Sequence, residues 1–290
     1  MPWTDLGLHA LALLLYPGLV AMAAAGLLAE AGAAGALVPE QGRLVPAARG
    51  MLAGLVPRTG LHALPPLATI AAVLALLAAP QIAAPLNPVA VPERNLLVAG
   101  MALAATAWLT WAWGWTRPQI DPGLLLLVQV CWLVALLTPA IVPENLRPQV
   151  LGAVMVRELL PLKIAATVLY ALCLPVLLQL IHESAPQGLP GASGRGRPGL
   201  EQAGFSVVRV LLWLPYCGLF SSLFFPPAGD DLVGALRFAG TTIGVGALSI
   251  VLAAYLTRRP AAATRRVYLR LVAPFAAFTV LVAILTAILS

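Results

Sequence analysis

Eight stretches of apolar residues, each about twenty residues long, occupy most of this 290-residue chain. A helix rises about 1.5 Å per residue, so crossing a hydrocarbon layer of roughly 30 Å takes about 20 apolar residues. Within lipid a helix satisfies its own backbone hydrogen bonds, which an open strand cannot do. Because the runs are continuous and lack strand-type alternation, the sequence predicts an all-α polytopic membrane protein.

The predicted spans form one integral membrane domain over residues 1–290. They lie near residues 6–29, 61–84, 95–116, 123–142, 162–181, 205–225, 234–256 and 270–289. Residues 182–204 are predicted to form a cytoplasmic loop. Six prolines inside the spans predict kinks, which neighbouring helices make tolerable: Pro17, Pro80, Pro139, Pro175, Pro215 and Pro274.

The segment 34–58 differs from the spans, because charged residues and two prolines interrupt its apolar residues. We interpret it as an interfacial or re-entrant segment that contains a short amphipathic helix around 46–56.

The composition fits a membrane protein, with 61% hydrophobic and 10% charged residues, where soluble domains have about 25% charged residues. A net charge of +6 spread over so much apolar sequence does not indicate nucleic-acid binding. Cys131, Cys173 and Cys217 fall inside apolar runs without metal-ligand spacing, so we expect them to be buried. Residues 1–5 carry no basic residue, which argues against a cleavable signal peptide.

Lysine and arginine are distributed unevenly between the two sides. Eleven arginines lie in the odd-numbered joins: Arg43, Arg49, Arg58, Arg117, Arg195, Arg197, Arg258, Arg259, Arg265, Arg266 and Arg270. The even-numbered joins hold four basic residues: Arg94, Arg147, Arg157 and Lys163. The positive-inside rule therefore predicts cytoplasmic odd joins and both termini outside the cytoplasm.

Polar residues at membrane depth are the functional candidates, because a charge at mid-membrane costs at least about 2.5 kcal/mol. Glu30 ends the first span, Gln129 lies inside the fourth, and Arg209 lies one turn into the sixth. Arg209 is either half of a structural ion pair, with Glu183 or Glu201 on the same side, or a functional pocket charge. Further basic and aromatic residues fit snorkelling or an interface belt: Arg157, Lys163, Arg237, Trp108, Trp111, Trp113 and Trp115.

The sequence holds no P-loop, nucleophile set, paired carboxylates or dinucleotide fingerprint. The histidines are scattered, and we expect no cofactor or metal bound by this chain alone.

The order of features resembles the quinone-proximal membrane subunit of respiratory complex I and its counterpart in formate hydrogenlyase and other group 4 [NiFe] hydrogenases. A Pro-led second span (Leu64-Pro-Pro-Leu67) precedes a third span that ends in Trp113-Gly-Trp115. Glu201-Gln-Ala-Gly204 is similar to the family's Glu-Tyr-Ser-Gly, and Arg258-Arg-Pro260 to its Arg-rich last join. The resemblance covers nearly the whole chain and implies eight spans with an amphipathic segment after the first.

Several positions depart from the family's pattern. The family's acidic loop before the sixth span keeps only Glu183 and Glu201, and Gln129 stands where the family has a membrane Glu. Glu30 keeps the place of a family Glu. An ion path needs carboxyls that can be neutralised and restored, so the resemblance implies a divergent member with a degenerate quinone site.

The resemblance implies a non-catalytic coupling subunit in a bacterial inner membrane. Its partners would be antiporter-like subunits and a cytoplasmic arm that carries the iron–sulfur clusters with NiFe or flavin. Contacts with the coupling ion or a quinone would fall to Glu30, Glu183, Glu201, Arg209 and Gln129. Two alternatives stay open: a stand-alone permease or lipid carrier, and a scaffold that has lost coupling.

Overall fold

The computed structural model describes residues 3–37, 66–113, 121–141, 143, 145–153, 160–181, 198–227 and 229–289. Every regular element within these ranges is helical, which confirms the all-α class for this part of the chain. Most of the predicted interfacial segment, including the helix expected around 46–56, lies outside the described residues.

Six helical segments in the described ranges are long and apolar enough to cross a membrane. They are Leu6–Ala33, Pro122–Ala140, Leu160–Leu177, Val207–Phe224, Leu232–Thr257 and Ala262–Ile288. The second and third predicted runs contain shorter apolar helices, Pro66–Gln81 and Leu96–Ala112. The chain is therefore a helical membrane protein with six candidate spans, and the two shorter helices leave the predicted total of eight open.

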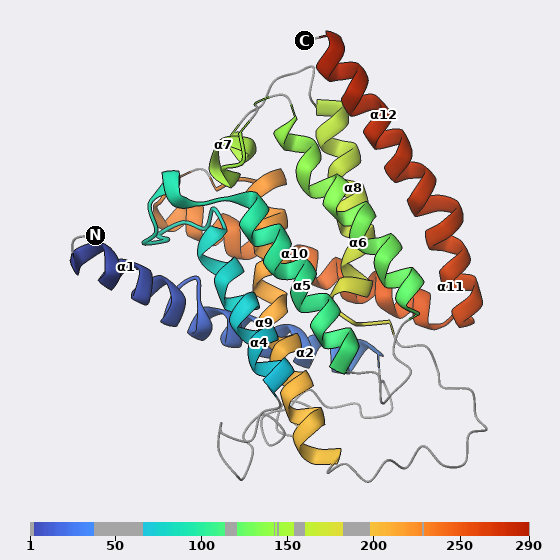
Figure 1. Cartoon of the computed structure of the whole chain (residues 1–290), viewed down its shortest axis with the longest axis horizontal. Coiled ribbons are helices and arrows are strands. Elements are labelled where there is room, and N and C mark those ends of the chain that lie inside the picture. Colours follow the sequence, from blue (N-terminus) through green and yellow to red (C-terminus); the bar gives the residue numbers. More distant parts are fainter. Residues whose placement is uncertain are drawn as a thin grey trace.

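Two helices make up the first span, α1 (Trp3–Leu14) and α2 (Leu19–Leu37), and the break between them contains Pro17. The remaining helices follow in order: α4 (Pro66–Ala78), α5 (Leu96–Trp113), α6 (Pro122–Leu137), α7 (Pro148–Ala153), α8 (Leu160–Leu177), α9 (Pro198–Phe224), α10 (Leu232–Thr257), α11 (Ala261–Val267) and α12 (Ala273–Leu289). Figure 1 shows α12 at one edge of the bundle and α9 in its middle.

The prolines act in two ways. Pro17 interrupts the first span, and Pro80 and Pro139 lie in short 3₁₀ turns that end α4 and α6. Pro175 and Pro215 stay inside continuous helices. A proline removes one backbone donor and clashes with the preceding turn. These two effects explain the break at Pro17 and the ends of α4 and α6 at Pro80 and Pro139.

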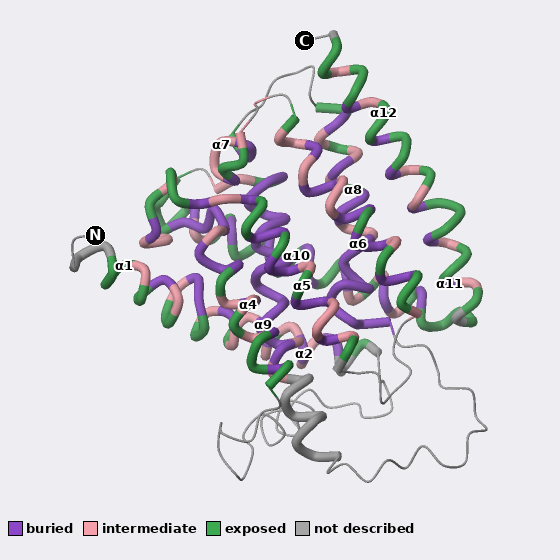
Figure 2. Tube along the Cα trace, viewed as in Figure 1, coloured by how far each residue is buried: buried purple, intermediate pink, exposed green. Residues whose placement is uncertain are grey.

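Helix α9 is the centre of the bundle. Of the residues in Val207–Phe224, 89% are buried, against 22% of the most apolar stretch in Ala262–Ile288 (Figure 2). Helices α2, α4, α8 and α10 all pack against α9. Its side chains therefore meet protein on most sides, whereas α12 presents most of its surface outward.

An aromatic cluster fills the space between α6, α8 and α9. The Trp132 ring packs edge-on against Tyr170 and Tyr216, with centroids 5.9 and 5.4 Å apart. The Tyr170 hydroxyl donates to the Tyr216 carbonyl at 3.0 Å, and the Tyr216 hydroxyl donates to the Leu103 carbonyl at 3.2 Å. Each of these buried hydroxyls thus has a hydrogen-bond partner. The three cysteines are also buried, as the sequence predicts.

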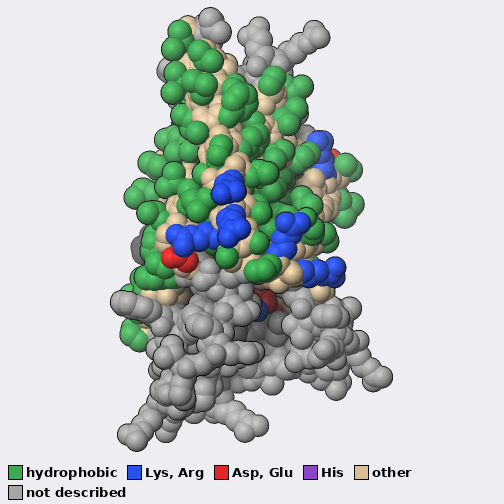
Figure 3. Space-filling view, turned by 90° about the vertical axis from the view of Figure 1, so that its right-hand side faces the viewer, with side chains coloured by type: hydrophobic (Ala, Val, Ile, Leu, Met, Phe, Trp, Pro, Cys, Tyr) green, Lys and Arg blue, Asp and Glu red, His purple; other side chains and the backbone are tan. Residues whose placement is uncertain are grey.

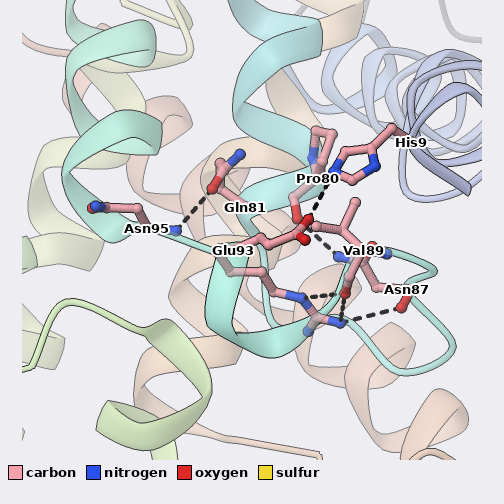
Figure 4. Close-up of polar contacts among 8 residues, drawn as sticks. His9, Pro80, Gln81, Asn87, Val89, Glu93 and Asn95 are labelled. Carbon is pink, nitrogen blue, oxygen red and sulfur yellow. Dashed lines mark hydrogen bonds and ion pairs between the residues drawn. The ribbon is translucent and has the colours of Figure 1, made fainter. Parts of the chain in front are cut away.

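The loop after α4 is organised by Arg94, and we call residues 82–95 the Arg94 loop. The guanidinium donates to the Val89 and Asn87 carbonyls and, at 2.8 Å, to the Gln149 side chain (Figure 4 draws the loop contacts). Burial lowers the pKa of the Arg94 guanidinium, and the nearby charge of Asp230 opposes that shift. The predicted join is therefore an ordered, arginine-centred turn.

One helix boundary differs from the prediction. Helix α9 begins at Pro198, inside the predicted loop 182–204, and includes Glu201 in its first turn, although its apolar span starts only at Val207. Proline is favoured at the first position of a helix, where its missing N–H is not needed. The sequence also did not predict α7 or α11 as separate helices.

Candidate functional site: a buried ion pair between α2 and α9

Glu30 of α2 and Arg209 of α9 form an ion pair inside the bundle. Arg209 Nη2 donates to Glu30 Oε2, and Trp213 Nε1 donates to Glu30 Oε1 at 2.8 Å. Glu30 is 1% exposed, and the Arg209 side chain is 20% exposed. Both carboxylate oxygens are therefore occupied, one by a cation and one by an indole.

A close approach of the two helices positions this pair. A Cβ placed on Gly26 would lie 1.9 Å from the Val210 carbonyl oxygen, so only glycine fits there. Glu30 lies one turn after Gly26 on α2, and Val210 lies between Arg209 and Trp213 on α9. Side chains four apart share one face of a helix, so the Gly26 contact sets Glu30 against both donors.

The two charges of this ion pair depend on each other, because Glu30 is shielded from water. Removing one partner of a buried ion pair typically costs 3–5 kcal/mol, because the other charge stays buried and uncompensated. Arg209 Nε is also buried, and no described residue accepts a hydrogen bond from it. The site therefore keeps a carboxyl group whose neutralisation would leave Arg209 without its counter-charge.

The structure pairs Arg209 with Glu30, whereas Glu183 and Glu201 are the partners that the sequence suggests for an ion pair. Glu183 lies outside the described residues, and Glu201 lies on α9, eight residues before Arg209. Eight helical residues span about 12 Å along the axis, which places Glu201 further toward the start of α9.

Gln129 is buried elsewhere, between α6 and α5. It is 4% exposed, and its Nε2 donates to the Ala104 carbonyl at 3.0 Å. An amide that bonds a neighbouring backbone can join two helices but cannot take up or release a proton. The structure gives Gln129 a role in joining helices.

The sequence interpretation missed a second buried polar contact. Gln179 Nε2 donates to Thr110 Oγ1 at 2.7 Å, and Gln179 Oε1 is buried without a partner among the described residues. Gln179 has φ 56° at the end of α8, and the Leu180 N–H donates to the Pro175 carbonyl at 2.9 Å. This bonding is that of a helix C-terminus where glycine is favoured, so a glutamine there is unusual.

The structure also locates two further basic residues. Lys163 Nζ donates to the Gly152 carbonyl at 2.9 Å, at the C-terminal end of α7 where a cation is favourable. Arg237 is exposed on α10. Lys163 therefore stabilises a helix end, while Arg237 keeps the exposure that snorkelling requires.

In the described ranges, no group of three or more His, Cys, Asp or Glu side chains lies close enough together to hold a metal ion. No protein-family model matches the chain, and no curated protein matches it in sequence.

Proposed function

We propose that this chain is a membrane-anchor and coupling subunit of a complex I-like or membrane-bound hydrogenase-like assembly. It would link a cytoplasmic redox arm to antiporter-like, ion-translocating neighbours. Iron–sulfur clusters and a NiFe or flavin centre would belong to the partner subunits. We place the chain in a bacterial inner membrane with both termini outside the cytoplasm.

The observation that supports this proposal most is the Glu30–Arg209–Trp213 arrangement. Glu30 keeps the place of a family carboxylate, is nearly inaccessible, and is held by a cation and an indole from α9. Ionisable residues that pair inside a membrane bundle commonly mark ion pathways, which is what coupling requires. With Gln129 bonded to backbone, we propose that coupling through this chain depends on Glu30 and Arg209, with Glu183 and Glu201 toward the cytoplasmic loop.

The first test is purification of the chain from its native membrane in mild detergent. The proposal predicts migration in a large assembly that contains iron–sulfur proteins, found by native electrophoresis and metal analysis. Migration as an isolated polypeptide would contradict it.

One observation favours the permease or lipid carrier. The first span is discontinuous at residues 15–18, and broken helices line the binding sites of many transporters. This alternative predicts that the purified chain moves a solute or lipid across liposomes unaided. The coupling subunit predicts no transport without its partners.

A further inference from the structure

We propose that an arginine patch at the junction of α10, α11 and α12 binds the phosphate of an anionic phospholipid. The patch consists of Arg258, Arg259, Arg265, Arg266 and Arg270, all of them exposed. Figure 3 shows lysine and arginine side chains gathered in a band on this face, below a broad hydrophobic surface.

The arginine patch lies at the edge of the exposed apolar surface of the bundle. Tyr255, one turn before Arg259, is 54% exposed, and the leucines on either side of Arg270 are 48% and 58% exposed. Exposed leucine next to exposed arginine is the arrangement of a helix end at the boundary between hydrocarbon and headgroups. A ligand there must offer an acyl chain to the leucines and an anion to the arginines.

Little of this positive charge is neutralised by the described part of the protein. Arg265 Nε lies 3.5 Å from Asp121 Oδ2, and among the described residues no carboxylate pairs with Arg258, Arg266 or Arg270. The Arg259 guanidinium stacks over the Tyr255 ring at 4.5 Å, which orients it without cancelling its charge. The patch thus keeps a surplus of guanidinium donors.

Phosphate matches these donors in geometry as well as in charge. A guanidinium binds a phosphate through two parallel N–H donors, and each basic residue near an anionic leaflet contributes about 1 kcal/mol. An acidic soluble protein could match the charge, but it would also have to cover leucines at the lipid boundary. The continuity of the patch with the lipid-facing surface therefore favours a phospholipid, whether or not the chain belongs to the proposed assembly.

The test compares two double variants in nanodiscs of phosphatidylcholine with or without phosphatidylglycerol. R266Q/R270Q removes two charges from the patch, and R147Q/R237Q removes two exposed charges elsewhere. Phosphatidylglycerol that stays bound after transfer to detergent is measured by native mass spectrometry over a lipid titration. At about 1 kcal/mol per arginine, R266Q/R270Q is expected to weaken binding roughly 30-fold, and the control, whose arginines lie outside the patch, to weaken it far less.

A third variant, R266K/R270K, keeps the charge but loses the two-donor geometry, and we expect intermediate binding. Equal retention of both lipids by the unaltered protein would overturn the proposal. So would equal losses of lipid binding in the two double variants. Binding of inorganic phosphate alone as tightly as phosphatidylglycerol would overturn it too, because the patch would then be a site for a free anion. Unchanged lipid binding with loss of a partner protein from R266Q/R270Q would also overturn it, and would assign the patch to protein docking.

Discussion

Two arginines, Arg94 buried and Arg209 partly buried, use different kinds of partner. Arg94 donates to carbonyls five and seven residues away in its own loop and to one neutral amide. Arg209 donates to a carboxylate 179 residues away in sequence, on another helix. Arg94 therefore fixes local chain geometry, whereas Arg209 joins two spans through opposite charges. Burial alone does not distinguish a structural arginine from one that can take part in coupling; the charge and origin of its acceptor do.

The largest effect is expected from Glu30→Ala, because it leaves the partly buried Arg209 without its counter-charge. We predict a loss of about 3–5 kcal/mol in the free energy of unfolding. Denaturant titration in detergent micelles measures it. Glu30→Ala/Arg209→Ala should recover much of that loss, and a double variant as unstable as the sum of the singles would show that the charges do not interact.

Gly26→Ala tests the helix contact that positions the pair. Its new Cβ would meet the Val210 carbonyl, so we predict a loss of about 3 kcal/mol, at the upper end for overpacking. Gly240→Ala is the matched control, because nothing lies within 4 Å of a Cβ built there. Equal thermal stability of the two variants would contradict the close approach of α2 and α9.

Arg94→Gln tests the local arginine. It removes several hydrogen bonds to buried carbonyls, for which we predict a loss of about 2 kcal/mol. Hydrogen exchange is the sharper measurement, because the change should raise exchange in residues 82–95 and leave the amides around Glu30 protected. Exchange spreading to α2 and α9 would show that the two arginines are not independent.

The smallest effect is expected from His9→Ala. His9 Nε2 lies 2.8 Å from Glu93 Oε2 (Figure 4), but both side chains are more than one third exposed. Exposed pairs contribute from nothing to about 1 kcal/mol. A change in thermal unfolding greater than that would mean that α1 is held to the Arg94 loop more strongly than this contact explains.

The sequence was sufficient to predict the helical membrane class and the burial of the three cysteines, and it singled out Glu30 and Arg209 as charges within apolar runs. Each rests on a local property, the length of an apolar run or a charge within one. It did not pair these two residues, because pairing depends on how α2 and α9 pack across a sequence separation of 179 residues. A local pattern was available, since Gly26 precedes Glu30 and Arg209 precedes Trp213 by four residues each.

The structure of the Arg94 loop was beyond sequence reasoning for a different reason. The sequence shows Arg94 only as a positive charge between two spans. Its bonding could not be predicted, because its acceptors are backbone carbonyls that any residue supplies. Gln179 was missed because a glutamine at a helix end has no pattern that predicts a positive φ.

The most direct test of coupling is ion translocation by the assembled complex in proteoliposomes, measured per electron transferred. Glu30→Gln, which keeps size but removes the charge, is compared with Glu93→Gln in the Arg94 loop, and Glu201→Gln extends the series. We predict that Glu30→Gln lowers ion translocation while Glu93→Gln does not. Unchanged translocation in both Glu30→Gln and Glu201→Gln would contradict a coupling role and leave the chain as a scaffold.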